Sequence, residues 1–414
     1  MRSVPPVDPG AREPGRGAAP PGPRRRPLLL LAPATFFEGY DMFVLALALP
    51  LIRKDFGLSM GEAGLVASIA FAGSFGVLAL LPLADRLGRR PVLALTITGY
   101  TVATFATAVV PGVVGFTACQ FAARLFLGTE YTLATIVAVE ASEPSRRGRT
   151  LGVLTSMAAL GQAAAGAGFL VVLATGASWR WLYAAGVIPL VLVARARRDL
   201  PETAPPVAGR PERFRLRRLP RPWLVGAATL ALLFAVYPTA VATLASTLVL
   251  DDWKWKVSNL QPWMFAVWAL GLSGFLVGGR LLDRLGRRPA TCLFLLGTAA
   301  AGAFSFTTGT TVTRAIGLGL VIFALTGATP CVAAIVTELF PVQIRGRANA
   351  WLKPLTIAGQ VVAPALGTAL AVPLGGVGPA LAALGGVNVI AAAVVWIALP
   401  ETRPLHSAIA AEAP

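Results

Sequence analysis

Four charged side chains lie near the middle of long apolar stretches of this sequence: Glu38, Asp41, Arg124 and Glu130. A charge held at the centre of a bilayer costs roughly 2.5–3.5 kcal/mol on insertion scales. Such groups must therefore pair with one another, take up a proton or face a water-filled cavity. Pairing that serves structure alone is one interpretation, and a site that binds protons and an anion is the other.

Glu38 and Asp41 are three residues apart, so both carboxyl groups lie on one face of the expected helix. Two neighbouring carboxylates cannot both ionise cheaply in a low-dielectric medium, whereas Arg124 stays charged at any accessible pH. Groups arranged in this way titrate as one unit. We expect Asp41 to bind a proton with help from Glu38, and Arg124 to be either its partner or the contact for an anionic substrate.

Glu130 and Lys353 each have two interpretations. Glu130 follows Arg124 by six residues, so the two side chains point to different sides of a helix. It therefore faces either the cavity, where it would assist proton coupling, or a neighbouring helix. Lys353 lies about two turns inside an apolar stretch, where its ammonium group either reaches the membrane interface or contacts the substrate.

Polar and aromatic side chains in the other apolar stretches complete the candidate substrate site. Gln162 and Gln360 each follow a glycine at matching places in the chain, and each either faces the cavity or forms a hydrogen bond between helices. Tryptophans near helix ends supply either an aromatic wall or an anchor at the membrane interface. We expect substrate contacts from Arg124, Tyr40, Gln162, Tyr237, Gln360, Trp263 and Asn388.

The elements that carry these residues follow from the hydropathy of the chain. Its 414 residues are 56% hydrophobic and 13% charged, with a mean hydropathy of +0.70, whereas about a quarter of a soluble domain is charged. A membrane-spanning helix needs about 20 apolar residues. Twelve stretches qualify and predict an all-α membrane protein: 28–52, 61–84, 91–111, 113–139, 150–174, 180–196, 223–249, 260–282, 290–309, 312–337, 348–371 and 379–399.

One charged segment, DRLGRRP, occurs at residues 85–91 and again 198 residues later, at 283–289. The same offset relates two RGR triplets and two Gly-Gln pairs, and LPET recurs at nearly the same spacing. These matches predict two pseudo-symmetric six-helix halves, a repeat type found in transporters. The expected domains are a disordered basic arm (1–27), a six-helix bundle (28–196), a cytoplasmic linker (197–222), a second six-helix bundle (223–399) and a cytoplasmic tail (400–414).

The repeated residues cluster where successive helices meet at one face of the membrane. Glycine permits a tight turn there, and arginine side chains hold helix ends at the interface. Simple anchoring is one interpretation; because an acid and a glycine recur with the arginines, we favour contacts that form and break as a gate. The expected gating residues are Asp85, Arg86, Gly88, Arg89, Glu140, Arg147, Asp283, Arg284, Gly286, Arg287, Glu338 and Arg345.

Positive charge is concentrated in alternate loops. The formal net charge is +17, and runs of arginine separate alternate apolar stretches, which is the pattern of loops that stay in the cytoplasm. This pattern predicts a multi-pass protein of the cell membrane with both termini in the cytoplasm, and it argues against binding to nucleic acid. A signal peptide is not expected, because the first apolar stretch is long enough to span the membrane.

The sequence lacks the motifs that predict an enzyme, a metal site or an organic cofactor. The only histidine is His406, and the three cysteines have no metal-binding or disulfide spacing. No HExxH, Ser-His or phosphate-cradling pattern occurs. We therefore expect no enzymatic activity, no cofactor apart from protons as the coupling ion, a small-molecule substrate and the lipid bilayer as partners, and a monomer.

Several of these motifs resemble the major facilitator superfamily. Its loop signature, Gly-x-x-x-Asp-Arg-x-Gly-Arg-Arg, matches residues 279–288, while the first copy has Leu81 in place of the glycine. RLFLG at 124–128 is similar to a motif of proton-coupled members, and the PET segments resemble the sugar-porter and organic-acid branch. FEGYD at 37–41 resembles the aromatic-acid/proton symporters, with Glu38 in place of their first aspartate.

The resemblance implies a secondary transporter whose two halves rock about a central site. We expect proton-coupled symport of an organic carboxylate, a class that includes aromatic acids, because an apolar cavity with one fixed cation suits a small amphipathic anion. Uptake of a sugar or another metabolite, drug/proton antiport, and a receptor on the same fold are the alternatives. The stretch around Tyr237 lacks the paired glutamines of sugar porters, and the stretch around Gln162 lacks the Gly-Pro pair of drug antiporters.

Overall fold

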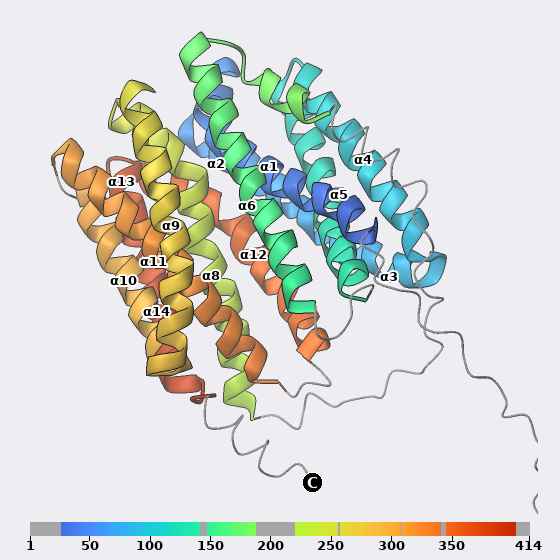
Figure 1. Cartoon of the computed structure of the whole chain (residues 1–414). Helices are drawn as coiled ribbons and strands as arrows, with labels where there is room; N and C mark the ends of the chain where they lie inside the picture. Colours follow the sequence, from blue (N-terminus) through green and yellow to red (C-terminus); the bar gives the residue numbers. More distant parts are fainter. Residues whose placement is uncertain are drawn as a thin grey trace, which may run out of the picture.

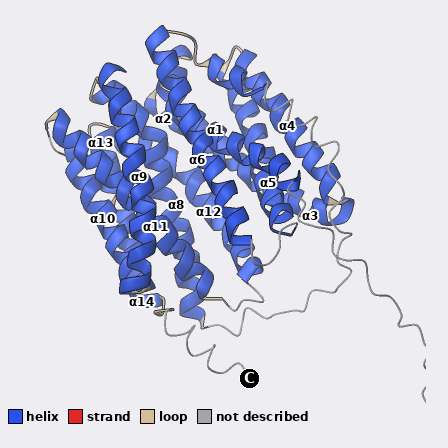
Figure 2. Cartoon of the chain, in the orientation of Figure 1, coloured by secondary structure: helices blue, strands red, loops and turns tan. Residues whose placement is uncertain are grey.

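The computed structural model describes residues 26–140, 147–187, 220–255, 257–307, 309–340 and 345–402, and within these ranges the regular structure is entirely helical (Figure 2). The all-helical prediction is therefore confirmed for the described part of the chain. All but the last two residues of the expected N-terminal arm, most of the linker and nearly all of the tail lie outside the described residues, as does the second half of the sixth apolar stretch. Residues 26 and 27 begin the first helix rather than ending the arm.

The first group of helices comprises the described residues from 26 to 187. Its members are α1 (Arg26–Asp55), α2 (Met60–Ala72), a 3₁₀ turn (Gly73–Gly76), α3 (Val77–Leu87), α4 (Arg89–Val109), α5 (Val113–Glu140), α6 (Arg147–Thr175) and the helical residues 180–187. Three prolines lie inside these helices, at positions 33, 50 and 82, which spanning helices tolerate because neighbouring groups satisfy the freed carbonyl oxygens.

The second group comprises the described residues from 220 to 402 and lies beside the first (Figure 1). Its members are α8 (Arg221–Thr247), a π turn (Leu248–Asp252), α9 (Val257–Leu285), α10 (Arg287–Thr307), α11 (Thr311–Glu338), α12 (Arg345–Ala371), α13 (Val377–Leu384) and α14 (Gly386–Ala398). Among the described residues of the two groups, nine helical segments are long and apolar enough to cross a membrane.

The outer surface of the bundle is apolar, as a lipid-facing surface must be. Large side chains such as Val171 (60%), Leu272 (66%) and Ile397 (83%) are exposed. Single exposed apolar residues are common in soluble proteins, but exposure on most of the helices indicates contact with a membrane or another apolar phase.

Two single-residue turns reproduce the repeat in the backbone. Gly88 separates α3 from α4 with a φ of 93°, and Gly286 separates α9 from α10 with a φ of 99°. L-residues with a side chain rarely adopt this conformation. The tight turn expected at both positions is present.

Glycines at equivalent positions also set the closest helix contacts. A Cβ atom at Gly161 of α6 would overlap the carbonyl oxygen of Phe36 in α1, and one at Gly359 of α12 would overlap that of Leu232 in α8. Small residues let membrane helices approach closely without an aqueous hydrophobic driving force. The Gly-Gln pairs therefore serve helix packing through their glycines.

The two groups touch mainly at one end of the bundle, which we call the Arg53 end after the last turn of α1; the opposite end is the Arg287 end. There the Ser246 hydroxyl donates to the Ala46 carbonyl at 2.6 Å, and the Ala365 N–H donates to the Ser68 hydroxyl at 3.1 Å. A buried apolar cluster of the second group also takes in Leu49, Ala63 and Leu170 of the first. The described contacts thus close the bundle at the Arg53 end.

Candidate functional site

Arg124 of α5 and Asp41 of α1 are buried inside the first group, each with 1% of its surface exposed. The Coulomb field of Arg124 reaches both Asp41 and Glu38. The structure therefore brings together the three residues on which the sequence-based hypothesis of proton coupling depends.

Among the described residues, the Arg124 guanidinium is held by a sulfur atom, a carbonyl oxygen and an aromatic ring rather than by a carboxylate. One terminal nitrogen contacts the Met42 sulfur, the other donates to the Met42 carbonyl at 3.5 Å, and the guanidinium carbon lies 4.5 Å from the centre of the Phe71 ring. A cation over an aromatic face gains about 0.5–2 kcal/mol. The Arg124 Nε is buried without a hydrogen-bond partner in the described part of the chain.

Asp41 is likewise incompletely satisfied. Its Oδ2 is buried without a hydrogen-bond partner among the described residues, although the Tyr100 hydroxyl, which donates to the Phe37 carbonyl at 3.5 Å, also lies against this carboxyl group. Within the described ranges no ion pair of 4 Å or less joins Arg124 to Asp41 or Glu38. Purely structural pairing would require such a contact, so the geometry favours the interpretation as a binding site.

Glu38 faces the second group. Its side chain is partly exposed, and it lies within the Coulomb fields of Lys353 on α12 and, more weakly, of Arg124. Lys353 is itself exposed. Of the two interpretations for Lys353, proximity to Glu38 supports the one in which its ammonium group lies near the central site.

Glu130 is separate from this cluster. It is buried with 1% exposure, and it accepts a hydrogen bond from the Thr96 hydroxyl of α4. Of the two expectations for Glu130, the contact with a neighbouring helix is the one that the geometry supports.

Three of the expected substrate contacts point into their own group. The Tyr40 hydroxyl donates to the Leu182 carbonyl at 2.7 Å. Tyr237 is fully buried against Gly302, and Asn388 is fully buried with both amide atoms unpartnered in the described structure. The expectation that these side chains line one site with Arg124 is not supported by their packing.

Gln162, Gln360 and Trp263 have other surroundings. Gln162 is exposed and Gln360 partly exposed, and in the described chain neither amide forms the interhelical hydrogen bond that was their alternative role. Gln162 lies two residues after the exposed Leu160, so the two side chains point about 200° apart around α6. Trp263 donates to the Ala315 carbonyl at 3.2 Å near the Arg53 end, as an anchoring tryptophan would.

The second copy of the charged repeat forms a network at the Arg287 end. Arg287 donates twice to the Glu338 carboxylate, at 2.8 and 2.9 Å, and Thr402 donates to the same group at 2.6 Å. Glu401 accepts the backbone N–H groups of Arg287 and Arg288 at 2.9 and 3.0 Å. Three repeated motifs, DRLGRRP, the acid before RGR and LPET, therefore meet in one place within the second group.

The other expected gating residues are less tightly held or lie outside the description. Asp283 is 78% exposed and 3.8 Å from Arg287, and Arg86 and Arg284 are exposed. Arg89 is partly buried and has partners. The side chains of Asp85, Glu140, Arg147 and Arg345 lie outside the described residues.

Sequence reasoning missed three side chains at the site, namely Met42, Phe71 and Tyr100. Met42 and Phe71 resemble ordinary apolar residues of a spanning helix, so no local signal separates them from the core. Tyr100 is the one with a usable signal, because its hydroxyl group lies in an apolar stretch and must find a partner when buried.

Comparison with known proteins agrees with this architecture. The family model described as "Major Facilitator Superfamily" matches residues 31–326 and 257–414. Among solved structures, the chain is similar to one titled "Crystal structure of D-xylose-proton symporter", with a TM-score of 0.77, 17% sequence identity, and coverage of 91% of this chain and 98% of that one. At this identity the likeness shows the fold alone.

Two curated relatives cover most of the chain. A niacin transporter of Acinetobacter baylyi is 26% identical over 412 residues, covering 89% of this chain and 92% of the relative. A 3-(3-hydroxy-phenyl)propionate transporter of Escherichia coli (strain K12) is 27% identical over 358 residues, covering 80% and 85%. Their names give niacin and 3-(3-hydroxy-phenyl)propionate as the compounds that these two relatives transport.

Proposed function

Because the chain belongs to the Major Facilitator Superfamily, we propose that it is a secondary active transporter that takes up a small aromatic carboxylate together with a proton. The observation that carries the proposal is the buried Arg124, whose guanidinium has no carboxylate partner within 4 Å among the described residues. A buried unpaired cation is costly. An anionic ligand would relieve that cost, and the names of the two relatives agree with this class of ligand.

Asp41 carries the proton in this account, with Glu38 assisting. A buried carboxylate without full hydrogen bonding is expensive when ionised, and protonation removes its charge. When Asp41 is neutral, the field of Arg124 is available to an anion; when Asp41 is ionised, it competes with that anion. Proton binding and carboxylate binding thus favour one another, which is the linkage that symport requires.

The proposed architecture has twelve spanning helices in two six-helix halves, 28–196 and 223–399, joined by a cytoplasmic linker. The equivalent turns at Gly88 and Gly286 support it, as do the equivalent glycine contacts of α6 and α12. The arginine-rich Arg287 end faces the cytoplasm in this proposal, as do both termini, and the protein sits in the cell membrane as a monomer without a cofactor.

Alternating access follows from rocking of the two groups about the central site. In the described conformation the groups are packed together at the Arg53 end, and in this proposal the Arg287 end is the side at which they separate to admit or release substrate. The network around Glu338 holds α10, α11 and the residues after α14 together. The second group then moves as one body rather than helix by helix.

Uptake assays in proteoliposomes test the proposal. Vesicles with an inwardly directed proton gradient should accumulate labelled nicotinate or benzoate, and collapse of the gradient by an uncoupler should stop accumulation. Nicotinamide, which replaces the carboxylate by a neutral amide, should compete poorly. Accumulation of D-xylose instead, or expulsion of a cationic dye, would contradict the substrate class and favour one of the alternatives.

A further inference from the structure

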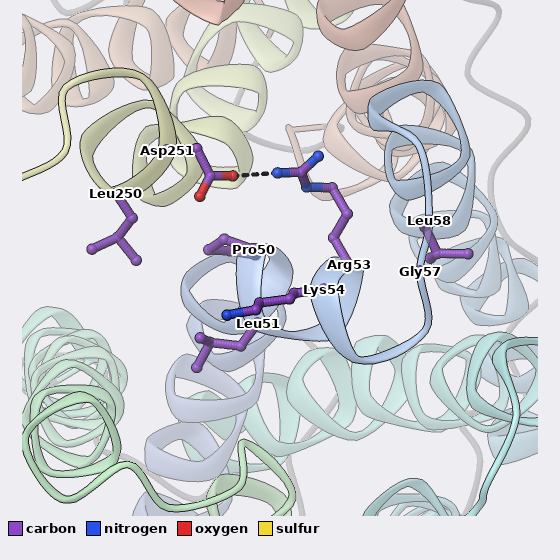
Figure 3. Close-up of a pocket in the computed structure, with 8 residues that line it drawn as sticks. All are labelled: Pro50, Leu51, Arg53, Lys54, Gly57, Leu58, Leu250 and Asp251. Carbon is purple, nitrogen blue, oxygen red and sulfur yellow. Dashed lines mark hydrogen bonds and ion pairs between the residues drawn. The ribbon is translucent and has the colours of Figure 1, made fainter.

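A pocket of about 390 Å³ lies at the Arg53 end, between the last turn of α1 and the π turn after α8 (Figure 3). Arg53, Lys54 and Asp251 supply its charged groups. The rest of the lining is mainly apolar, and consists of Pro50, Leu51, Gly57, Leu58 and Leu250. Cations beside apolar walls match a small molecule that has a carboxylate at one end and a hydrocarbon body.

An ion pair crosses this pocket from one group of helices to the other. The Arg53 Nη2 lies 2.5 Å from the Asp251 Oδ2, and the two side chains point toward each other (Figure 3). Arg53 and Asp251 are 198 residues apart, which is the offset of the repeat. The two groups thus carry opposite charges at equivalent positions, and their ion pair is one of the contacts that close the Arg53 end.

The pocket has more cationic than anionic capacity. The Arg53 Nε is buried without a partner in the described structure, and Lys54 is exposed and forms no hydrogen bond or ion pair with the described residues. The neighbouring acid, Asp252, accepts the Val377 N–H at 3.1 Å and so is committed to the start of α13. The pocket lining therefore holds two cations and one carboxylate. Asp252 does not line the pocket, although its charge also acts on Arg53.

We propose that this pocket is a second binding site, distinct from Arg124, at which a carboxylate binds Lys54 and competes with Asp251 for Arg53. The class of ligand rests on the proposed function. Arginine pairs with carboxylates through two parallel hydrogen bonds, and the Arg53 Nε and Nη2 together offer such a pair. Arg53 follows Asp41 by twelve residues, so the two sites are about 18 Å apart along α1.

Binding here opens the Arg53 end. A ligand shifts a conformational equilibrium only through its different affinity for the two states. The carboxylate gains its full contact with Arg53 only after Asp251 has left, which is also the step that separates α1 from α8. The arriving anion thereby weakens the ion pair between Arg53 and Asp251, which must separate before the anion can reach Arg124.

The distance between two spin labels at the Arg53 end measures this opening. Gly112 in the first group and Gly309 in the second are exposed, with open space around each. Cysteines at these positions, in a background with Cys119, Cys292 and Cys331 replaced by alanine, accept nitroxide labels. In lipid nanodiscs, nicotinate should lengthen the distance between the labels, whereas nicotinamide at the same concentration should not.

Two variants separate ligand binding from the ion pair. Lys54→Gln should keep the short distance without ligand and raise the half-saturating nicotinate concentration about tenfold or more, as loss of one charged hydrogen bond predicts. Asp251→Asn should lengthen the distance without any ligand. Asp55→Asn is the matched control, because it breaks an ion pair to Arg180 of 2.6 Å inside the first group alone, and it should change neither quantity.

The outcomes also distinguish this proposal from the proposed function. If nicotinate accumulates in proteoliposomes while Lys54→Gln and Asp251→Asn behave as the unmodified chain does, the pocket proposal is wrong and the proposed function stands. If Asp251→Asn opens the Arg53 end but neither nicotinate nor benzoate does so in the unmodified chain, the carboxylate site in this pocket is wrong. The substrate class is wrong as well only if proteoliposomes also fail to accumulate either acid.

Discussion

The two groups of helices share a packing scheme but differ in chemistry at equivalent positions. The first group buries Asp41, Arg124 and Glu130 in its interior. In the second group, residues 198 positions later are Thr239, Ile322 and Ala328, which carry no charge.

The second group concentrates its described network of charges at a helix end instead, where Arg287 meets the carboxylates of Glu338 and Glu401. Charges at a helix end are within reach of water, whereas charges in mid-membrane must be neutralised or used. The difference teaches that the glycine contacts and turns of the repeat build a common scaffold. The asymmetric charges then assign ion and substrate chemistry to the first group.

The largest expected effect comes from making the first group resemble the second at position 124. Arg124→Gln should abolish measurable uptake and weaken carboxylate binding by at least about thirtyfold, since loss of a buried charge contact costs about 2–5 kcal/mol. Binding of labelled nicotinate to purified protein measures this effect. Arg124→Lys keeps the charge but loses the fork of donors, so its affinity for nicotinate should lie between those of the unmodified chain and Arg124→Gln. Unchanged binding in Arg124→Gln would contradict the assignment.

A smaller effect is expected from breaking the network of the second group. Arg287→Gln removes two charge-assisted hydrogen bonds to Glu338 and should lower the free energy of unfolding by about 1.5–3 kcal/mol. Its effect on nicotinate affinity should be slight, because Arg287 lies at the helix end. Thermal unfolding in detergent and nicotinate binding, measured on the same sample, separate the loss of stability from any loss of affinity. A loss of affinity as large as that of Arg124→Gln would remove the distinction between the groups.

Tyr100→Phe sharpens the comparison inside the first group. The change removes a hydroxyl group that lies against Asp41 and donates to the Phe37 carbonyl, and one such hydrogen bond contributes about 0.5–1.5 kcal/mol. The pH at which uptake is half-maximal should shift measurably, while nicotinate binding at saturating proton concentration stays within about threefold. An identical pH profile in the variant would place Tyr100 outside the coupling site.

The smallest effect is expected at Glu130, which is buried but bound to Thr96 rather than placed beside Arg124. Glu130→Gln preserves the shape and can still accept the Thr96 hydrogen bond, so proton-driven accumulation should continue with a modest loss of stability. Accumulation ratios with and without an uncoupler provide the measurement. Loss of coupling in this variant would show that the charges of the first group act as one larger unit.

The fold was largely predictable from the sequence because hydropathy and glycine are local signals. Apolar stretches of spanning length appear as helices within a few residues of the expected limits, as for α4 and α11. The glycines of DRLGRRP predicted turns that the backbone contains. The clusters of arginine and acidic residues predicted contacts at one end of the bundle. They did not predict that Arg287, Glu338 and Thr402 would form a single network.

The candidate site was only partly predictable, because the face of a helix is fixed by its neighbours. Asp41 and Arg124 were identifiable, since charge in an apolar stretch is conspicuous. Tyr40 lies one residue from Asp41 yet points to the Leu182 carbonyl, and Tyr237 packs on Gly302. Spacing along the chain gives the angle between two side chains, but only the assembled bundle shows which angle faces the centre.

The most direct test of the account is the behaviour of Asp41→Asn in proteoliposomes. The account predicts that this variant exchanges labelled nicotinate for unlabelled nicotinate across the membrane, yet fails to accumulate it under an inward proton gradient. Exchange and accumulation measured on the same vesicles separate substrate binding from proton coupling. Gradient-driven accumulation by Asp41→Asn, with the pH dependence of the unmodified chain, would contradict the central claim that the Asp41–Arg124 cluster couples protons to transport.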